Sequence, residues 1–212
     1  MAVVGVGRRR GSPPPPPCWT DPANRVNDVV PTSTHATGVI VALPELAAFT
    51  SPWRSTSYAP DHPTLSIERR FPPHVTMLSP FAKPDDDGAL ARLRRVAERH
   101  EPFDLVFTHA EQFGPGGAVW LVPEPADVVQ GLLDDVLAAF PEYPPYEGEH
   151  PDPTPHLTVT AVGDDSTLRQ VRAALAGRGP ITARVSELGV WQRGDDDVWR
   201  PAASAPLGAS HS

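Results

Sequence analysis

The chain has 212 residues, a single cysteine and a formal net charge of −8 at pH 7. One cysteine excludes a disulfide framework and a metal cage built from cysteines, and no apolar run reaches the roughly 18 residues of a membrane span. The acidity argues against a protein that holds a long nucleic-acid tract along its backbone, because phosphates attract a basic surface.

The first 36 residues predict a disordered tail that is rich in arginine and proline. Arg8, Arg9 and Arg10 are followed by a run of five prolines, 13–17, which favours a solvated polyproline II segment. From there to Ala36 the sequence keeps neither the period of a strand nor that of a helix. We therefore expect one folded domain over residues 37–205 and a flexible tail over 206–212.

The first half of this domain predicts strands that alternate with helices. In chain order these are a strand over 39–43, a short helix over 45–50, a proline-broken loop over 51–64, a strand over 75–81, and a helix that begins at Asp85–Asp87 and ends near His100.

The second half predicts strands over 103–107 and 119–122, joined by a glycine-rich loop, then a helix over 126–140 and a loop over 142–155. A strand over 156–162, a helix over 166–176 and a final strand pair over 181–191 and 198–203 complete it, with a turn at 194–197. Short strand-to-strand connections recur between the helices. This order favours an α+β fold with largely antiparallel sheets over a doubly wound parallel sheet.

Two tetrapeptides share the pattern proline, histidine, aliphatic residue, threonine. They are Pro73-His74-Val75-Thr76 and Pro155-His156-Leu157-Thr158, one in each half of the domain. Residues i and i+2 of a strand point to the same face. We therefore expect each histidine to project together with its threonine, and the two pairs to face one cleft if a pseudo-twofold axis relates the halves.

Two such pairs suit in-line displacement at phosphorus without a metal ion. That chemistry requires a base behind the attacking oxygen and an acid on the leaving oxygen. Histidine titrates near pH 6.5, so one neutral and one protonated imidazole can coexist near neutrality. The threonine hydroxyls can donate to the non-bridging oxygens, where charge develops. The two motifs are too alike for the sequence to say which histidine is the acid.

The paired motifs and the order of elements resemble the 2H phosphoesterase superfamily, the 2′-5′ RNA ligase-like family, over roughly residues 38–205. The resemblance implies a bilobal α+β fold, with two pseudo-symmetric sheets flanking a central cleft and helices outside. It also implies a cofactor-free cyclic phosphodiesterase, or reversible RNA ligase, that acts on 2′,3′-cyclic or 2′-5′-linked phosphodiesters of RNA ends or nucleotides. Catalytic roles carry over to His74, Thr76, His156 and Thr158. We expect a cytoplasmic monomer that takes part in RNA processing.

Further residues near the motifs are candidates for substrate binding. Arg69 and Arg70 precede the first motif and could bind a phosphate. Phe81 and Trp120 could stack on a base, although core packing is the alternative for each aromatic residue. We expect no metal site, because His150 and Asp152 lack the third or fourth ligand that zinc requires.

Two other functions fit the same sequence. A protein of this fold could bind a nucleotide or a phosphorylated metabolite without turning it over, or it could act on a phosphoester that does not come from RNA. The two intact motifs favour an enzyme over the binding module.

Overall fold

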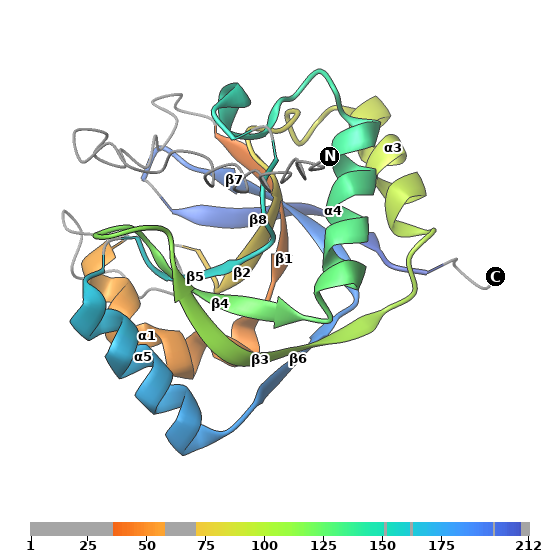
Figure 1. Cartoon of the computed structure of the whole chain (residues 1–212). Helices are drawn as coiled ribbons and strands as arrows, with labels where there is room; N and C mark the ends of the chain where they lie inside the picture. The colour runs from red at the N-terminus through yellow and green to blue at the C-terminus, as the bar shows by residue number, and fades with distance from the viewer. Residues whose placement is uncertain (1–35, 58–70, 151, 162, 197, 209–212) are drawn as a thin grey trace, which may run out of the picture.

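The computed structural model describes residues 36–57, 71–150, 152–161, 163–196 and 198–208. An eight-stranded sheet runs through them, in the order β6-β3-β4-β5-β2-β1-β7-β8 (Figure 1). The strands are β1 (Thr37–Ala42), β2 (His74–Leu78), β3 (Phe103–Gln112), β4 (Val119–Glu124), β5 (Leu157–Thr160), β6 (Ile181–Val185), β7 (Glu187–Arg193) and β8 (Trp199–Pro206), and each pairing is antiparallel. The helices are α1 (Ala47–Ser57), α3 (Asp87–Ala97), α4 (Ala126–Ala139) and α5 (Asp165–Arg178), with 3₁₀ turns η1 (Pro44–Leu46) and η2 (Pro145–Gly148).

The sheet consists of two four-stranded halves that meet at β5 and β2. A strand–helix–strand–helix unit occurs in each half of the chain, as β1-α1-β2-α3 and as β4-α4-β5-α5. In Figure 1 the helices α1 and α5 lie together at the lower left of the curled sheet, and α3 and α4 lie together at its upper right. This arrangement confirms the predicted α+β fold with largely antiparallel strands. The two expected sheets are the two halves of one continuous sheet.

The loop predicted over 51–64 is wrong for its first part, because α1 continues through Ser57. Pro52 lies inside the helix and removes one backbone donor. Phe49 and Arg54 are both buried on α1, so packing of this helix outweighs the cost of the proline. Residues 58–64 lie outside the described part of the chain.

The single strand predicted over 181–191 is also wrong, because the chain divides at Ser186. β6 pairs with β3 in one half of the sheet, whereas β7 pairs with β1 and β8 in the other. Ile181, Ala183 and Val185 are buried at alternate positions, but the next buried residue is Leu188. The alternation therefore shifts by one residue where the chain passes from one half of the sheet to the other.

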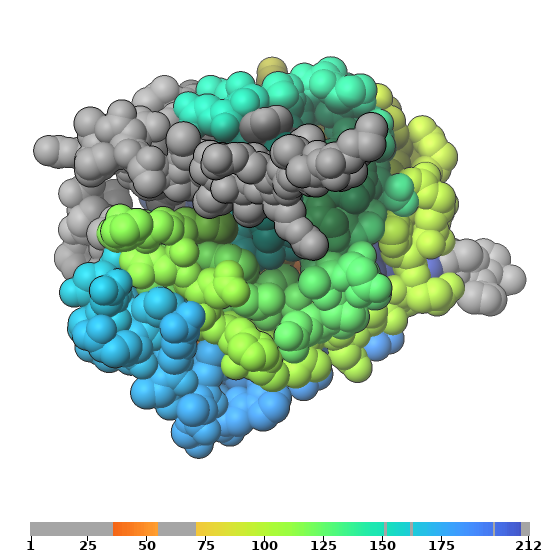
Figure 2. Space-filling model, viewed as in Figure 1, coloured from red at the N-terminus to blue at the C-terminus, as the bar shows by residue number. Residues whose placement is uncertain are grey.

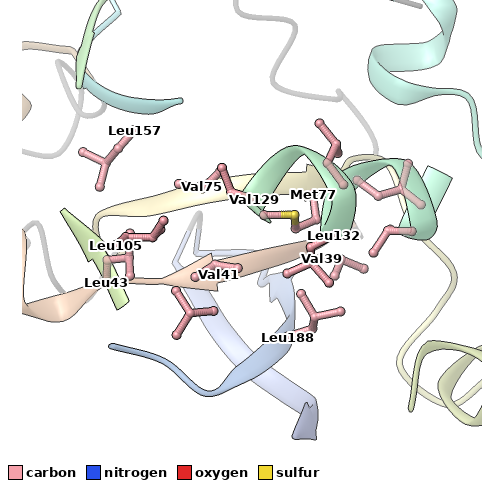
Figure 3. Packing of buried hydrophobic residues seen from close by; sticks show 14 of the residues in the cluster. Val39, Val41, Leu43, Val75, Met77, Leu105, Val129, Leu132, Leu157 and Leu188 are labelled. Atoms are coloured by element: carbon pink, nitrogen blue, oxygen red, sulfur yellow. The ribbon is translucent and has the colours of Figure 1, made fainter. Parts of the chain in front are cut away.

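The hydrophobic core lies between the helices and the sheet face that carries Val75 and Leu157 (Figure 3). Both residues are fully buried, as are Val129 and Leu132 of α4. Because neighbouring residues of a strand point to opposite faces, His74, Thr76, His156 and Thr158 point away from this core. Packing on one face of the sheet thus fixes the motif side chains on the other.

Replacement of Leu132 by alanine is expected to lower the free energy of unfolding by about 2–5 kcal/mol, because it leaves a cavity at a fully buried site. The matched control is Val128→Ala on the same helix, where the side chain is 37% exposed and the change should stay within about 0.5 kcal/mol. Denaturant unfolding of both variants measures this. Equal losses in the two variants would contradict the placement of α4 on the core.

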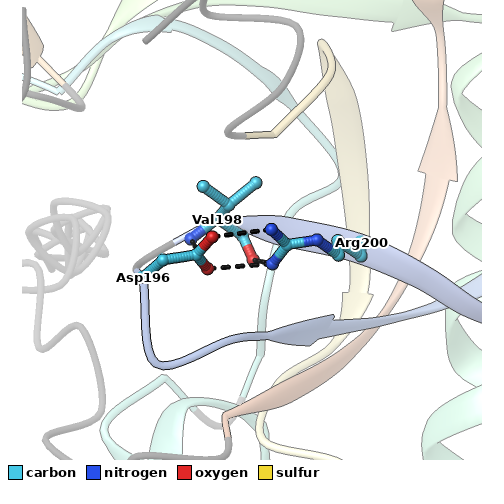
Figure 4. A network of polar contacts seen from close by, with 3 residues as sticks. All are labelled: Asp196, Val198 and Arg200. Carbon is cyan, nitrogen blue, oxygen red and sulfur yellow. Dashed lines mark hydrogen bonds and ion pairs between the residues drawn. The ribbon is translucent and has the colours of Figure 1, made fainter.

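The turn between β7 and β8 is closed by a bidentate ion pair (Figure 4). Arg200 donates from Nη1 to Oδ1 of Asp196 over 2.8 Å and from Nη2 to Oδ2 over 2.6 Å. These hydrogen bonds hold the pKa of the Asp196 carboxyl well below its usual range. The expected hairpin is confirmed by the antiparallel pairing of β7 with β8 and, for the turn, over its described residues 194–196. Asp196 neutralises Arg200 of the same hairpin.

Candidate active site

The two motifs lie side by side at the centre of the sheet. β2 and β5 are antiparallel, and Val75 of one motif is paired with Leu157 of the other. In this antiparallel register His74 lies opposite Thr158, and Thr76 lies opposite His156. The two histidines are therefore diagonal neighbours across the two strands. Diagonal neighbours of this kind are about 7–8 Å apart, within reach of long side chains. All four motif side chains are half-buried and form one group on one face.

Each motif histidine is held by the same backbone contact. The Nδ1 atom of His74 lies 2.8 Å from the carbonyl oxygen of Pro72, and that of His156 lies 2.7 Å from the carbonyl oxygen of Thr154. A carbonyl oxygen only accepts, so Nδ1 carries the proton in both rings. In the neutral ring Nε2 is then the base, and in the charged ring Nε2 is the acid.

The motif prolines support this contact. Proline restricts the residue before it to extended conformations, and Pro73 and Pro155 follow the two residues whose carbonyls accept from the histidines. Both prolines are buried. The conformation of the accepting carbonyl is thereby restricted in each motif before the strand begins.

Burial of the ring disfavours the charged form of both imidazoles. It lowers the pKa of His74 to about 3; the hydrogen bond to Pro72 opposes the shift, and the positive charges of Arg54 and His156 add to it. Burial also lowers the pKa of His156, where the Thr154 carbonyl opposes the shift and the charge of His150 adds to it. A negatively charged ligand between the rings would restore a proton to one of them.

Aromatic side chains pack against the first histidine. The ring centroid of Phe71 lies 3.9 Å from that of His74. Phe71 stacks in turn on Trp199 at 4.5 Å, and Trp191 lies 5.9 Å from it. These contacts exclude water from one side of the imidazole and fix the plane of its ring.

A second aromatic pair packs against His156. Phe113 and Trp120 meet the imidazole edge to face, with centroids at 4.9 and 5.8 Å, and they stack on each other at 5.0 Å. Phe113 lies in the loop that joins β3 and β4, where a Cβ at Gly117 would collide with the Phe113 carbonyl. The indole N–H of Trp120 is buried and has no hydrogen-bond partner among the described residues.

A hollow of about 340 Å³ lies one strand beyond His74. Ala42, which lines it, is paired with His74 and so faces the same side of the sheet. Its other lining residues include Glu187, Gly189, Trp191 and Ser204. A separate hollow of about 370 Å³ lies between β3 and α5, and the residues that line it include His109 and Arg172 and none of the four motif residues.

In Figure 2 the end of β3, in yellow-green, and the segment around η2, in teal, lie on opposite sides of the face that is turned to the viewer. The amide of Tyr146 in η2 donates to the carbonyl of Ser79 over 2.7 Å, just after β2. The segment that leads into the second motif is thereby tied to the strand of the first.

The other predicted binding residues are placed differently. Trp120 lies beside His156, as described above. Phe81 is buried in the core, edge to face with Phe140 at 5.0 Å, so the structure does not bring it to the histidines. Arg69 and Arg70 lie outside the described residues. Within the described part of the chain, no three His, Cys, Asp or Glu side chains are grouped to hold a metal ion, and no helix is long and apolar enough to cross a membrane.

Sequence reasoning missed Arg54, Phe71 and Trp199. Arg54 was placed in a loop because Pro52 suggested the end of the helix. Phe71 comes just before the first motif, and its position there was the available signal. Trp199 reaches Phe71 from the last strand, a contact that only the order of strands in the sheet reveals.

The comparisons with known proteins agree with this fold. The crystal structure of Escherichia coli LigT complexed with 3′-AMP is similar, with a TM-score of 0.53 and 17% identity over 82% of this chain and 98% of that one. The apo form of the same protein gives 0.51 and 16% over the same shares. No curated protein matches the chain.

These likenesses show the fold, which is the one that the paired motifs predicted. A family model adds evidence from the sequence itself: the model of the 2′-5′ RNA ligase superfamily matches residues 43–197, a span that holds both motif histidines and most of the sheet. On that match the chain belongs to the 2′-5′ RNA ligase superfamily.

Proposed function

We propose that this chain is a metal-independent phosphodiesterase that opens 2′,3′-cyclic phosphates, or cleaves 2′-5′ linkages, at RNA ends or on nucleotides. The observation that carries the proposal is the matched placement of His74 and His156 on neighbouring strands. Each has Nδ1 bound to a backbone carbonyl, and each has Nε2 left as the titrating atom. We further propose that it acts as a cytoplasmic monomer.

The reaction follows from the positions of the four motif side chains. One Nε2 takes a proton from the attacking water, and the other gives a proton to the ribose oxygen that leaves. The two imidazoles lie on a diagonal, which leaves room for the phosphoryl group between them. The hydroxyls of Thr76 and Thr158 lie beside the opposite histidines and can donate to the non-bridging oxygens as their charge increases. When the 5′-hydroxyl of a second RNA end attacks the cyclic phosphate in place of water, the same two proton transfers form a 2′-5′ linkage, release the 3′-oxygen of the ribose and so join two RNA ends.

The hollow beside Trp191 is the proposed place for the nucleoside. It lies on the same face as His74, one strand away, and its volume of about 340 Å³ is of the size that small-molecule sites have. Trp191 offers a flat apolar surface, and Glu187 offers a carboxylate that accepts from the amino groups of a base. The 3′-AMP bound by LigT, which has the same fold, supports a nucleotide as the ligand.

A panel of nucleoside 2′,3′-cyclic phosphates and 2′-5′-linked dinucleotides tests this proposal. We expect turnover of at least one of them, with a single product, the 2′- or the 3′-monophosphate, because the two histidines approach phosphorus from fixed sides. Phosphorus NMR assigns the product. A protein that binds a cyclic nucleotide and forms no product would be the catalytically idle binding module, and the proposal would be wrong.

A further inference from the structure

Arg54 of α1 is a buried cation behind the first motif. Its side chain is 2% exposed, and its Nη2 donates to the carbonyl of Phe71 over 2.6 Å and to the carbonyl of Pro72 over 3.3 Å. A guanidinium is charged at every pH at which proteins are folded. A permanent positive charge is therefore fixed to the backbone that enters the first motif.

The carbonyl of Pro72 joins Arg54 to His74. It accepts from the guanidinium, and it also lies 2.8 Å from Nδ1 of His74. The other acceptor of Arg54 belongs to Phe71, whose ring packs on the imidazole at 3.9 Å. Arg54 therefore orients both the carbonyl that sets the His74 tautomer and the aromatic ring that sets its plane.

The two histidines differ in the charges that face them. Arg54 and His156 act on His74, and both disfavour a second positive charge there. His150 acts on His156. The contact of His156 with the Thr154 carbonyl matches the contact of His74 with the Pro72 carbonyl. The aromatic neighbours of the two rings differ, and the permanent charge of Arg54, which acts on His74, is a further difference between the two sites.

We propose that Arg54 is the positioning residue that makes His74 the general base and leaves His156 as the general acid. The inference rests on the proposed function. Neutral His74 accepts the proton of the attacking water at Nε2 as the new phosphorus–oxygen bond forms. His156, protonated beside the phosphate anion, gives its Nε2 proton to the ribose oxygen as the old bond breaks. The catalytic steps leave His74 charged and His156 neutral, and one proton exchange with solvent restores both.

The test is the pH dependence of kcat/KM for Arg54→Gln and Arg54→Lys. A base must be neutral, so activity is lost as pH falls through the pKa of His74. Loss of the cation raises that pKa, so in Arg54→Gln the acid limb of the kcat/KM profile should move to higher pH by about one unit. Arg54→Lys keeps the charge but loses the contact with the carbonyls of Phe71 and Pro72. In this variant the acid limb should stay in place while kcat falls. Arg184→Gln removes an exposed arginine of β6 and should change neither limb.

Titration of the imidazole nitrogens by NMR gives a second readout that needs no turnover. In the wild type, His156 should gain its proton at higher pH than His74, and Arg54→Gln should raise the pKa of His74. If Arg54→Gln does not fold, the wild-type order and the Arg54→Lys profile still decide the question. The inference is overturned if His74 titrates above His156, if Arg54→Gln moves the alkaline limb, or if it leaves both limbs in place. Absence of any wild-type turnover would instead refute the proposed function.

Discussion

Replacement of either motif histidine by alanine is expected to lower kcat for cyclic phosphate hydrolysis by about 10²- to 10⁴-fold, the usual contribution of one general acid or base. The reason is that, in the proposed mechanism, each ring carries one of the two proton transfers of the same displacement at phosphorus. Loss of both histidines should therefore cost much less than the product of the two single losses.

Initial rates of His74→Ala, His156→Ala and the double variant measure this. The control is His109→Ala, which removes an exposed histidine on β3 that lies beside Glu124 and should leave the rate unchanged. Circular dichroism and thermal unfolding check that each variant is folded. A folded His74→Ala or His156→Ala protein with the wild-type rate would contradict the assignment of both rings to the reaction.

Replacement of Thr76 or Thr158 by valine should lower kcat by about 10²-fold and leave KM nearly unchanged, because the hydroxyl is used where charge develops on the non-bridging oxygens. Valine keeps the shape of the side chain, so packing of the half-buried site is preserved. Steady-state kinetics on the best substrate of the panel separates the two constants.

Serine at the same positions provides the matched comparison. Thr76→Ser and Thr158→Ser keep the hydroxyl and lose a methyl group, so both should retain most of the wild-type kcat. If serine is as damaging as valine, the methyl group matters through packing and the hydroxyl does not donate to the phosphate.

Strand geometry made the centre of this site predictable from the sequence. The rule that residues two apart share a face places each histidine with its threonine, and the buried Val75 and Leu157 between them confirm that alternation. The expectation of two separate sheets came from the resemblance to the 2H phosphoesterase superfamily. The structure joins them through the pair of Val75 and Leu157, which makes the motifs adjacent strands.

The surroundings of the histidines could not be predicted, because they depend on contacts between distant segments. Trp199 of β8 stacks on Phe71. Arg54 binds the carbonyl of Phe71 from α1, in a segment where Pro52 indicated a loop. One local signal was present in the sequence. The apolar residues Ile181, Ala183 and Val185 are two positions apart, but the next apolar residue, Leu188, follows Val185 after three positions. That shift indicates two strands in place of one.

The most direct test of the central claim is the rate of 2′,3′-cyclic nucleotide hydrolysis in EDTA by the wild type and by the His74→Ala/His156→Ala double variant. We predict that the wild-type rate is the same with and without EDTA and that the double variant falls to the background rate. Loss of the wild-type rate in EDTA, or a double variant that hydrolyses the substrate as fast as the wild type, would contradict a metal-independent site built on the two histidines.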